Sequence, residues 1–89
     1  MRAVVTVLGS DKVGIIAKVT AVLAEYNVNI LDITQTIMQN IFTMIMLVDI
    51  SNSSIPFSEL VDILGDTGKE LGVDIKTQHE DIFKSMQEI

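Results

Sequence analysis

The stretch from Leu8 to Asp32 constrains the fold of this chain more than any other part of the sequence. The valine-rich run Ala3–Leu8 at its start predicts a buried strand. A loop bounded by Gly9 and Gly14 then leads directly into a helical pattern. Its apolar residues lie three and four positions apart, at Ile15, Ile16, Val19, Val22, Leu23 and Tyr26. The stretch therefore predicts a strand, a loop, a helix and a second strand in close succession.

The sequence also indicates how this predicted helix begins and where it ends. Asn27 is expected to end the helix, because asparagine tolerates the left-handed backbone conformation that a helix end often needs. Asp11 precedes the helix and could cap it by accepting a backbone N–H. A helix N-terminus also presents unpaired N–H groups and the positive end of the helix dipole. The loop that ends at Gly14 could therefore hold a carboxylate or a phosphate.

Two long strands are predicted next, Val28–Met38 and Ile41–Ile50, joined as a hairpin by the turn Gln39-Asn40. One face of the second strand carries Phe42, Met44, Met46, Val48 and Ile50. The other face carries Ile41, Thr43, Ile45 and Leu47. An antiparallel sheet with one face in water would not be apolar on both sides. We therefore expect another chain or another segment to cover the second face.

The remaining residues predict a helix, a strand and a final helix. The helix is Phe57–Leu71, with Gly65 and Gly68 weakening its second half. The alternating run Val73–Thr77 predicts a half-exposed edge strand. Residues 80–89 predict a short amphipathic helix with one apolar face, made of Ile82, Phe83, Met86 and Ile89.

The predicted order is β-α-β-β-α-β followed by a helix. This order is the ferredoxin-like motif, an α+β fold with a four-stranded antiparallel sheet and both helices on one face. We expect a single domain over residues 1–89, with its core at about residues 2–78 and the C-terminal helix at about 80–89.

Composition narrows the expected partners. A domain of 89 residues buries only about 60% of the surface that its unfolded chain exposes, yet 48% of these residues are hydrophobic. We therefore expect a second copy of the chain to cover apolar surface, as a homodimer or a higher homo-oligomer. The net charge of −6 disfavours direct binding to nucleic acids and to anionic membranes. The sequence lacks a signal-peptide pattern and a membrane-length apolar run, so a cytoplasmic location is expected.

Several functions of this fold are disfavoured by missing residues. An RNA-recognition module needs aromatic side chains on its sheet, and this chain has three Phe and one Tyr. A metal-carrying domain would want paired cysteines, and the chain has none. An acylphosphatase-like site needs an arginine in the phosphate loop, whereas Arg2 lies at the far end of the first strand. The single histidine, His79, is expected to be a surface or structural residue. No catalytic residue, metal ligand or cofactor is predicted.

Two segments carry a resemblance to a known family. Gly-Ser-Asp-Lys-Val-Gly-Ile-Ile-Ala at residues 9–17 and Val-Asn-Ile-Leu-Asp at residues 28–32 resemble the ACT domain, a small ferredoxin-like regulatory module that typically binds amino acids. The resemblance covers about residues 2–78. The form of the loop is also similar to stand-alone ACT proteins related to the glycine-cleavage repressor. Two features depart from the pattern: Val13 stands where a proline often precedes the glycine, and a helix follows Thr77.

The resemblance implies a ligand site between this loop and the start of the second strand, often at a dimer interface. Four contact positions are carried over on this basis: Asp11, Gly14, Asn29 and Ile30. The backbone N–H groups around Val13, Gly14 and Ile15 would receive the ligand carboxylate. Asp11 could accept from the ligand ammonium, and the amide of Asn29 can donate or accept.

Each of these positions also has a structural interpretation that involves no ligand. Asp11 could be only a helix cap, Gly14 only the helix entry, and Asn29 only a polar edge residue. The leading hypothesis is a non-catalytic homodimer that binds a small amino acid. The alternative hypothesis is a protein-interaction module without a small ligand, which docks on a partner through the apolar face of its C-terminal helix or through its acidic surface.

Overall fold

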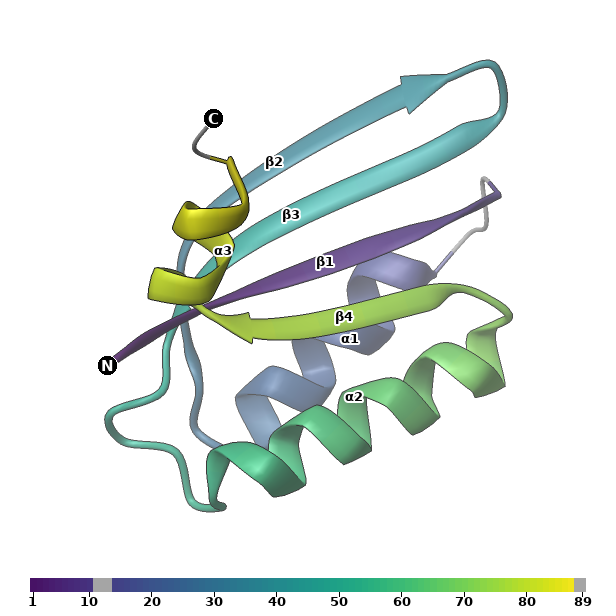
Figure 1. The fold of residues 1–89 in the computed structure, drawn as a ribbon. Coiled ribbons are helices and arrows are strands. Elements are labelled where there is room, and N and C mark those ends of the chain that lie inside the picture. The colour runs from purple at the N-terminus through teal and green to yellow at the C-terminus, as the bar shows by residue number, and fades with distance from the viewer. Residues whose placement is uncertain (11–13, 88–89) are drawn as a thin grey trace.

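The computed structural model describes residues 1–10 and 14–87. Its elements, drawn in Figure 1, are β1 (Arg2–Ser10), α1 (Ile15–Glu25), β2 (Asn29–Met38), β3 (Ile41–Asp49), α2 (Phe57–Leu71), β4 (Asp74–His79) and α3 (Glu80–Gln87). This is the predicted order of strands and helices. Asp11 and Val13, two of the predicted ligand contacts, lie outside the described residues.

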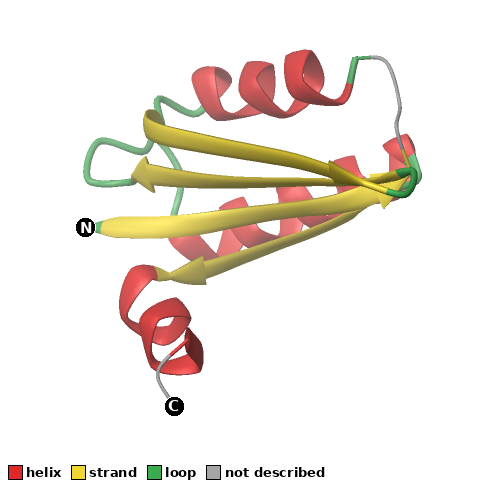
Figure 2. Cartoon of the chain, turned by 90° about the horizontal axis from the view of Figure 1, so that it is seen from above, coloured by secondary structure: helices red, strands yellow, loops and turns green. Residues whose placement is uncertain are grey.

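The four strands form one antiparallel sheet in the order β2-β3-β1-β4. The strands β1 and β3 are therefore central, and β2 and β4 are the edges. Figures 1 and 2 show α1 and α2 on one face of this sheet and α3 against the opposite face, beside the start of β1. The predicted ferredoxin-like fold is confirmed.

The hydrophobic core lies between the sheet and the two large helices. The sheet contributes Ala3, Val5 and Val7 from β1 and Phe42, Met44, Met46 and Val48 from β3. The helices contribute Ile15, Val19 and Leu23 from α1 and Leu60 and Leu64 from α2. Of the two apolar faces predicted for this strand, the one that carries Phe42 and Met44 is the buried one, because successive side chains of a strand point to opposite faces.

The opposite face of the sheet is only partly covered. Val4 lies on this face and is 4% exposed, and α3 contacts β1, the strand that carries it. Farther along the same face, Ile45 and Leu47 are half-buried and Ile41 is 53% exposed. The second apolar face predicted from the sequence is therefore present, and α3 covers only one end of it.

The helix α2 runs unbroken through both of its glycines. A Cβ atom at Gly68 would stand 2.8 Å from the carbonyl oxygen of Val73 and 3.1 Å from Cγ1 of Ile75. Glycine thus permits close approach of α2 to β4, and this packing outweighs its low helix propensity. At 15 residues α2 is the longest described helix, and no helix in the described part of the chain is long and apolar enough to cross a membrane.

Candidate functional site

The first predicted half of the site is the N-terminus of α1. Gly14 is the N-cap residue and has a φ of +89°, in the left-handed region that favours glycine. The intrahelical hydrogen bonds begin where the N–H of Lys18 donates to the carbonyl oxygen of Gly14, at 3.0 Å. The N–H groups of the preceding helical residues therefore point out of the end of the helix. Ile15 is 2% exposed and belongs to the hydrophobic core, so its side chain cannot contact a ligand.

The second predicted half is the start of β2. Asn29 is exposed, whereas Ile30 is half-buried and packs against the core. Asn29 borders a surface hollow of about 430 Å³, whose other lining residues are Ala24, Asn27, Val28, Asp49 and Asn52. This hollow combines amide groups with one carboxylate, which is a suitable lining for a small polar molecule.

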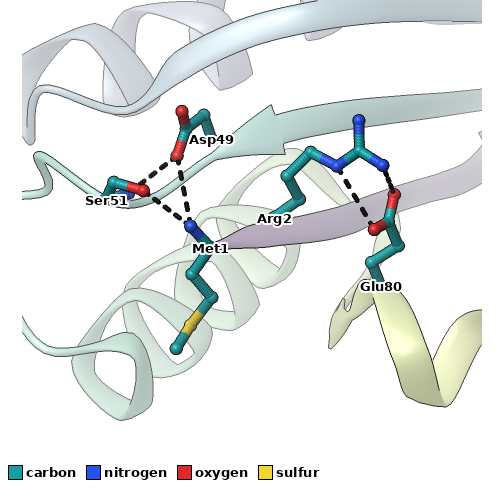
Figure 3. Close-up of polar contacts among 5 residues, drawn as sticks. All are labelled: Met1, Arg2, Asp49, Ser51 and Glu80. Carbon is teal, nitrogen blue, oxygen red and sulfur yellow. Dashed lines mark hydrogen bonds and ion pairs between the residues drawn. The ribbon is translucent and has the colours of Figure 1, made fainter.

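The carboxylate of this hollow belongs to Asp49, at the end of β3. Its Oδ1 accepts from the N–H of Ser51 at 2.9 Å and lies 3.7 Å from the amino group of Met1, which in turn donates to Oγ of Ser51 at 2.6 Å (Figure 3). Hydrogen bonding by Ser51 lowers the pKa of the Asp49 carboxyl below its ordinary value. Asp49 is therefore ionised at neutral pH and can attract a cation.

Two asparagines hold the rest of the hollow in shape. Asn27 has a φ of 60°, which is the left-handed conformation predicted for it at the end of α1. Its Nδ2 donates to the carbonyl oxygen of Asn52 at 2.9 Å and so ties the α1–β2 connection to the loop after β3. The backbone of Asn29 is opposite Asp49 in the β2–β3 ladder. Asn27, Asp49 and Asn52 were not predicted as site residues from the sequence. The strand register brings Asp49 to Asn29, and the hydrogen bond from Asn27 brings the loop at Asn52 to the same place.

The two halves of the predicted site lie at opposite ends of the sheet. Asn29 pairs with Asp49 at the end of the sheet where β1 begins, at Arg2. Gly14 follows Ser10, which pairs with Ile41 at the other end. The helix α1 connects the two ends, and its 11 residues span about 16 Å. One small amino acid therefore cannot contact Gly14 and Asn29 of the same chain.

The lone histidine has a structural role. The rings of His79 and Phe57 stack with their centroids 4.1 Å apart, so the histidine packs β4 against the start of α2. Its neighbour Glu80 accepts two contacts from Arg2, at 2.7 Å and 3.2 Å, which fasten α3 to β1 (Figure 3). Residues 1–10 and 14–87 contain no group of three or more His, Cys, Asp or Glu that could hold a metal ion.

Comparison with known proteins identifies the family. Residues 2–78 match the family profile described as the ACT domain. The chain belongs to the ACT domain family. This confirms the resemblance seen in the loop before α1 and at the start of β2.

Two relatives align with this ACT domain chain over nearly the whole length of both chains. It is 58% identical over 88 residues to the UPF0237 protein of Methanocaldococcus jannaschii, covering 99% of this chain and 98% of that protein. An ACT domain protein from Streptococcus pneumoniae is 40% identical, with a TM-score of 0.82 and coverage of 93% of each chain.

The same fold occurs within a longer chain. A protein assigned as a glycine cleavage system transcriptional repressor has a TM-score of 0.73 at 23% identity, with coverage of 86% of this chain and 44% of that protein. At this identity the likeness shows a shared fold.

Proposed function

We propose that this chain is a non-catalytic regulatory ACT module that binds a small amino acid at a site shared by two copies of the chain. The observation that carries the proposal is the hollow at the start of β2, where Asn29 lies beside the ionised carboxylate of Asp49. An amino acid offers an ammonium group to such a carboxylate and hydrogen-bonding groups to the amide of Asn29.

The carboxylate of the ligand requires a separate group. The N-terminus of α1 supplies backbone N–H groups and a positive dipole end. Gly14 leaves room for close approach, since no atom of residues 1–10 or 14–87 is in contact with its Cβ position within 4 Å. Gly14 and Asn29 lie at opposite ends of one sheet. The N-terminus of α1 from one copy would therefore lie against the hollow of the other copy.

The first test is a thermal-shift panel of the twenty amino acids with the full chain. A ligand at one hundred times its dissociation constant stabilises the folded state by about 2.7 kcal/mol. In a domain of this size each kcal/mol moves the melting temperature by roughly 4–8 °C. We expect a clear shift with one or two amino acids, which Asn29→Ala and Gly14→Asp each abolish and the exposed β4 variant Lys76→Ala retains. A panel without any shift would contradict the proposal.

A mixing experiment tests whether the site is shared. Asn29→Ala and Gly14→Asp each damage both sites of a symmetric dimer. A mixed dimer of the two variants contains one site with neither change and one site with both. We therefore expect refolding of the two variants together to restore binding to part of the protein. If the mixture binds no better than either variant alone, the site does not combine two chains.

The alternative function is docking of a protein partner through α3. It is favoured by the exposure of Ile82 and Met86, which are 52% and 59% exposed and lie one helical turn apart. A chain with both residues changed to Ser would lose such a partner and keep its response to amino acids. Loss of the amino-acid response in that variant would instead assign α3 to the ligand site.

A further inference from the structure

The face of the sheet that points away from α1 and α2 is open over most of its length. Along β1 and β3 the side chains on this face alternate with the buried residues of the core. The strand pairing sets them in two adjacent rows from β4 to β2: Lys76, Thr6, Ile45 and Thr34 in one, and Asp74, Leu8, Thr43 and Thr36 in the next. Within these two rows only β4 carries charged residues, so the middle of the face is uncharged.

The uncharged part of this face is also apolar. Leu8 is 44% exposed, and Ile45 is half-buried. Met38 and Ile41, which pair with each other at the far end of the same face, are 68% and 53% exposed. Contiguous apolar surface of this kind marks a contact with another molecule.

The side chains in the middle of the face suit a second sheet. Thr6, Thr43 and Ile45 are β-branched, and side chains of this shape pack well on the pleated surface of a sheet. Two antiparallel sheets pack face to face about 10 Å apart, with their strands within about 30° of each other. The open face therefore fits another sheet of the same kind.

The charges on β4 indicate that this other sheet belongs to a second copy of the chain. Asp74 and Lys76 are both exposed and lie on the same face, about 6.8 Å apart. A second copy that runs in the reverse direction presents its Lys76 to Asp74 and its Asp74 to Lys76. The net charge of −6 disfavours self-association in general, but it arises from residues outside these two rows.

We propose that two copies pack face to face through these rows, about a two-fold axis that runs across the strands and passes between the two rows. Thr43 of each copy then lies against Ile45 of the other, and Lys76 of each lies over Asp74 of the other. The inference goes beyond the proposed function, because this contact lies in the middle of the sheet, between the two ends that the proposed ligand site uses.

The helix α3 explains why the second copy must run in the reverse direction. It lies over one end of this face, where it contacts β1 and β4 (Figures 1 and 2). If both copies ran in the same direction, their α3 helices would meet and hold the sheets apart, because a helix with its side chains is about 10 Å thick. In the reverse direction each α3 lies beside the far end of the other sheet, where Met38 and Ile41 are exposed.

The size of this contact predicts a weak association. Four strands about 4.8 Å apart make the sheet about 19 Å wide, and the open part of β1 from Thr6 to Ser10 is about 17 Å long. With α3 included, two copies bury roughly 900 Å² in total, which is the size of a weak and reversible interface. The association is therefore expected to depend on protein concentration.

Light scattering of the full chain at concentrations from about 1 to 100 μM tests the contact. We expect Thr43→Lys to halve the mass measured at the highest concentration, because each lysine would be buried against Ile45 of the second copy without a partner charge. The control Ser58→Lys adds the same charge at an exposed position of α2 and should keep the natural mass. Circular dichroism checks that both variants fold. Equal masses for the two folded variants would overturn the inference, as would a natural chain that stays monomeric.

An exchange of charges tests the register of the contact. Lys76→Asp places carboxylates of the two copies opposite each other and should raise the dissociation constant about 10-fold. The double variant Asp74→Lys/Lys76→Asp makes opposite charges face each other again, so its dissociation constant should return to within about 3-fold of the natural value. The control Lys69→Asp makes the same change of net charge at an exposed position of α2 and should have no such effect. Sedimentation equilibrium measures all four chains. A double variant as weak as Lys76→Asp shows that the register is wrong.

The inference and the proposed function fail in different ways. A folded Thr43→Lys variant of reduced mass that still responds to an amino acid supports the face-to-face contact and leaves the ligand site intact. A variant of unchanged mass overturns the contact, whether or not the chain responds to amino acids. A natural chain that responds to no amino acid, but whose assembly Thr43→Lys divides, supports the contact and contradicts the proposed ligand.

Discussion

At the scale of single residues, two glycines of the same helix, α2, have opposite structural roles. Among the described residues, a Cβ at Gly65 would meet no atom within 4 Å, whereas one at Gly68 would be 2.8 Å from a backbone oxygen of Val73. Helix propensity alone treats both positions equally. Comparing the two positions therefore distinguishes the effect of helix propensity from the effect of packing α2 on β4.

We predict that Gly65→Ala stabilises the chain by about 0.5–1 kcal/mol, because alanine restricts the unfolded chain and favours the helix. Gly68→Ala should destabilise it by about 1–3 kcal/mol, because the methyl group forces α2 away from β4. Urea denaturation of both variants measures these changes. If the two substitutions change the free energy of unfolding in the same direction, the result would contradict the close packing of α2 on β4 at Gly68.

Asp49 gives a prediction about pH at the same scale. Its folded-state pKa is lowered, so its carboxylate contributes stability above the unfolded pKa of about 3.9, and this is lost as pH falls through the folded value. Asp49→Asn should therefore lower the melting temperature at pH 6 more than at pH 2. Melting temperatures across this range provide the measurement, with exposed Asp74→Asn as the control. An equal loss at both pH values would contradict the assigned role of Ser51.

At the scale of elements, the fold could be predicted well and the site only in part. Periodicity alone indicated the strands and helices, including both faces of the strand that contains Met44 and Leu47, because each element buries a regular set of side chains. It could not show that Gly14 and Asn29 lie at opposite ends of the sheet, since this depends on which strand ends pair. For the same reason, the sequence did not associate Asp49 with Asn29.

The attachment of α3 provides an element-scale prediction. Arg2 contacts Glu80 through two nitrogens, at 2.7 Å and 3.2 Å, whereas Lys84 reaches it only at 3.9 Å and is 63% exposed. We expect Arg2→Ala to cost about 0.5–1 kcal/mol and Lys84→Ala close to zero, because exposed single contacts contribute little. Hydrogen exchange of the α3 amides should become faster in Arg2→Ala only. Equal exchange in both variants would mean that α3 is held by its apolar contacts alone.

At the scale of the whole molecule, the central question is how a small chain with so much apolar surface remains stable. The described chain leaves Ile37, Met38 and Ile41 more than half exposed at the β2–β3 end of the sheet. A dimer would cover part of this surface, and its stability would then depend on the concentration of chains.

We predict that the melting temperature of the natural chain rises with protein concentration between about 1 and 100 μM. Scanning calorimetry at several concentrations measures this dependence. A natural chain without this dependence would contradict self-association in that range.

The separation of Gly14 from Asn29 by the length of α1 has a consequence for the protein as a detector in a cell. If each binding site needs one end from each of two chains, dilution removes the sites as well as the assembly. The response would then depend on how much of the protein is made, and not only on how much amino acid is present. A mutant chain in which either Gly14 or Asn29 is replaced would also reduce the response of the normal chains with which it assembles.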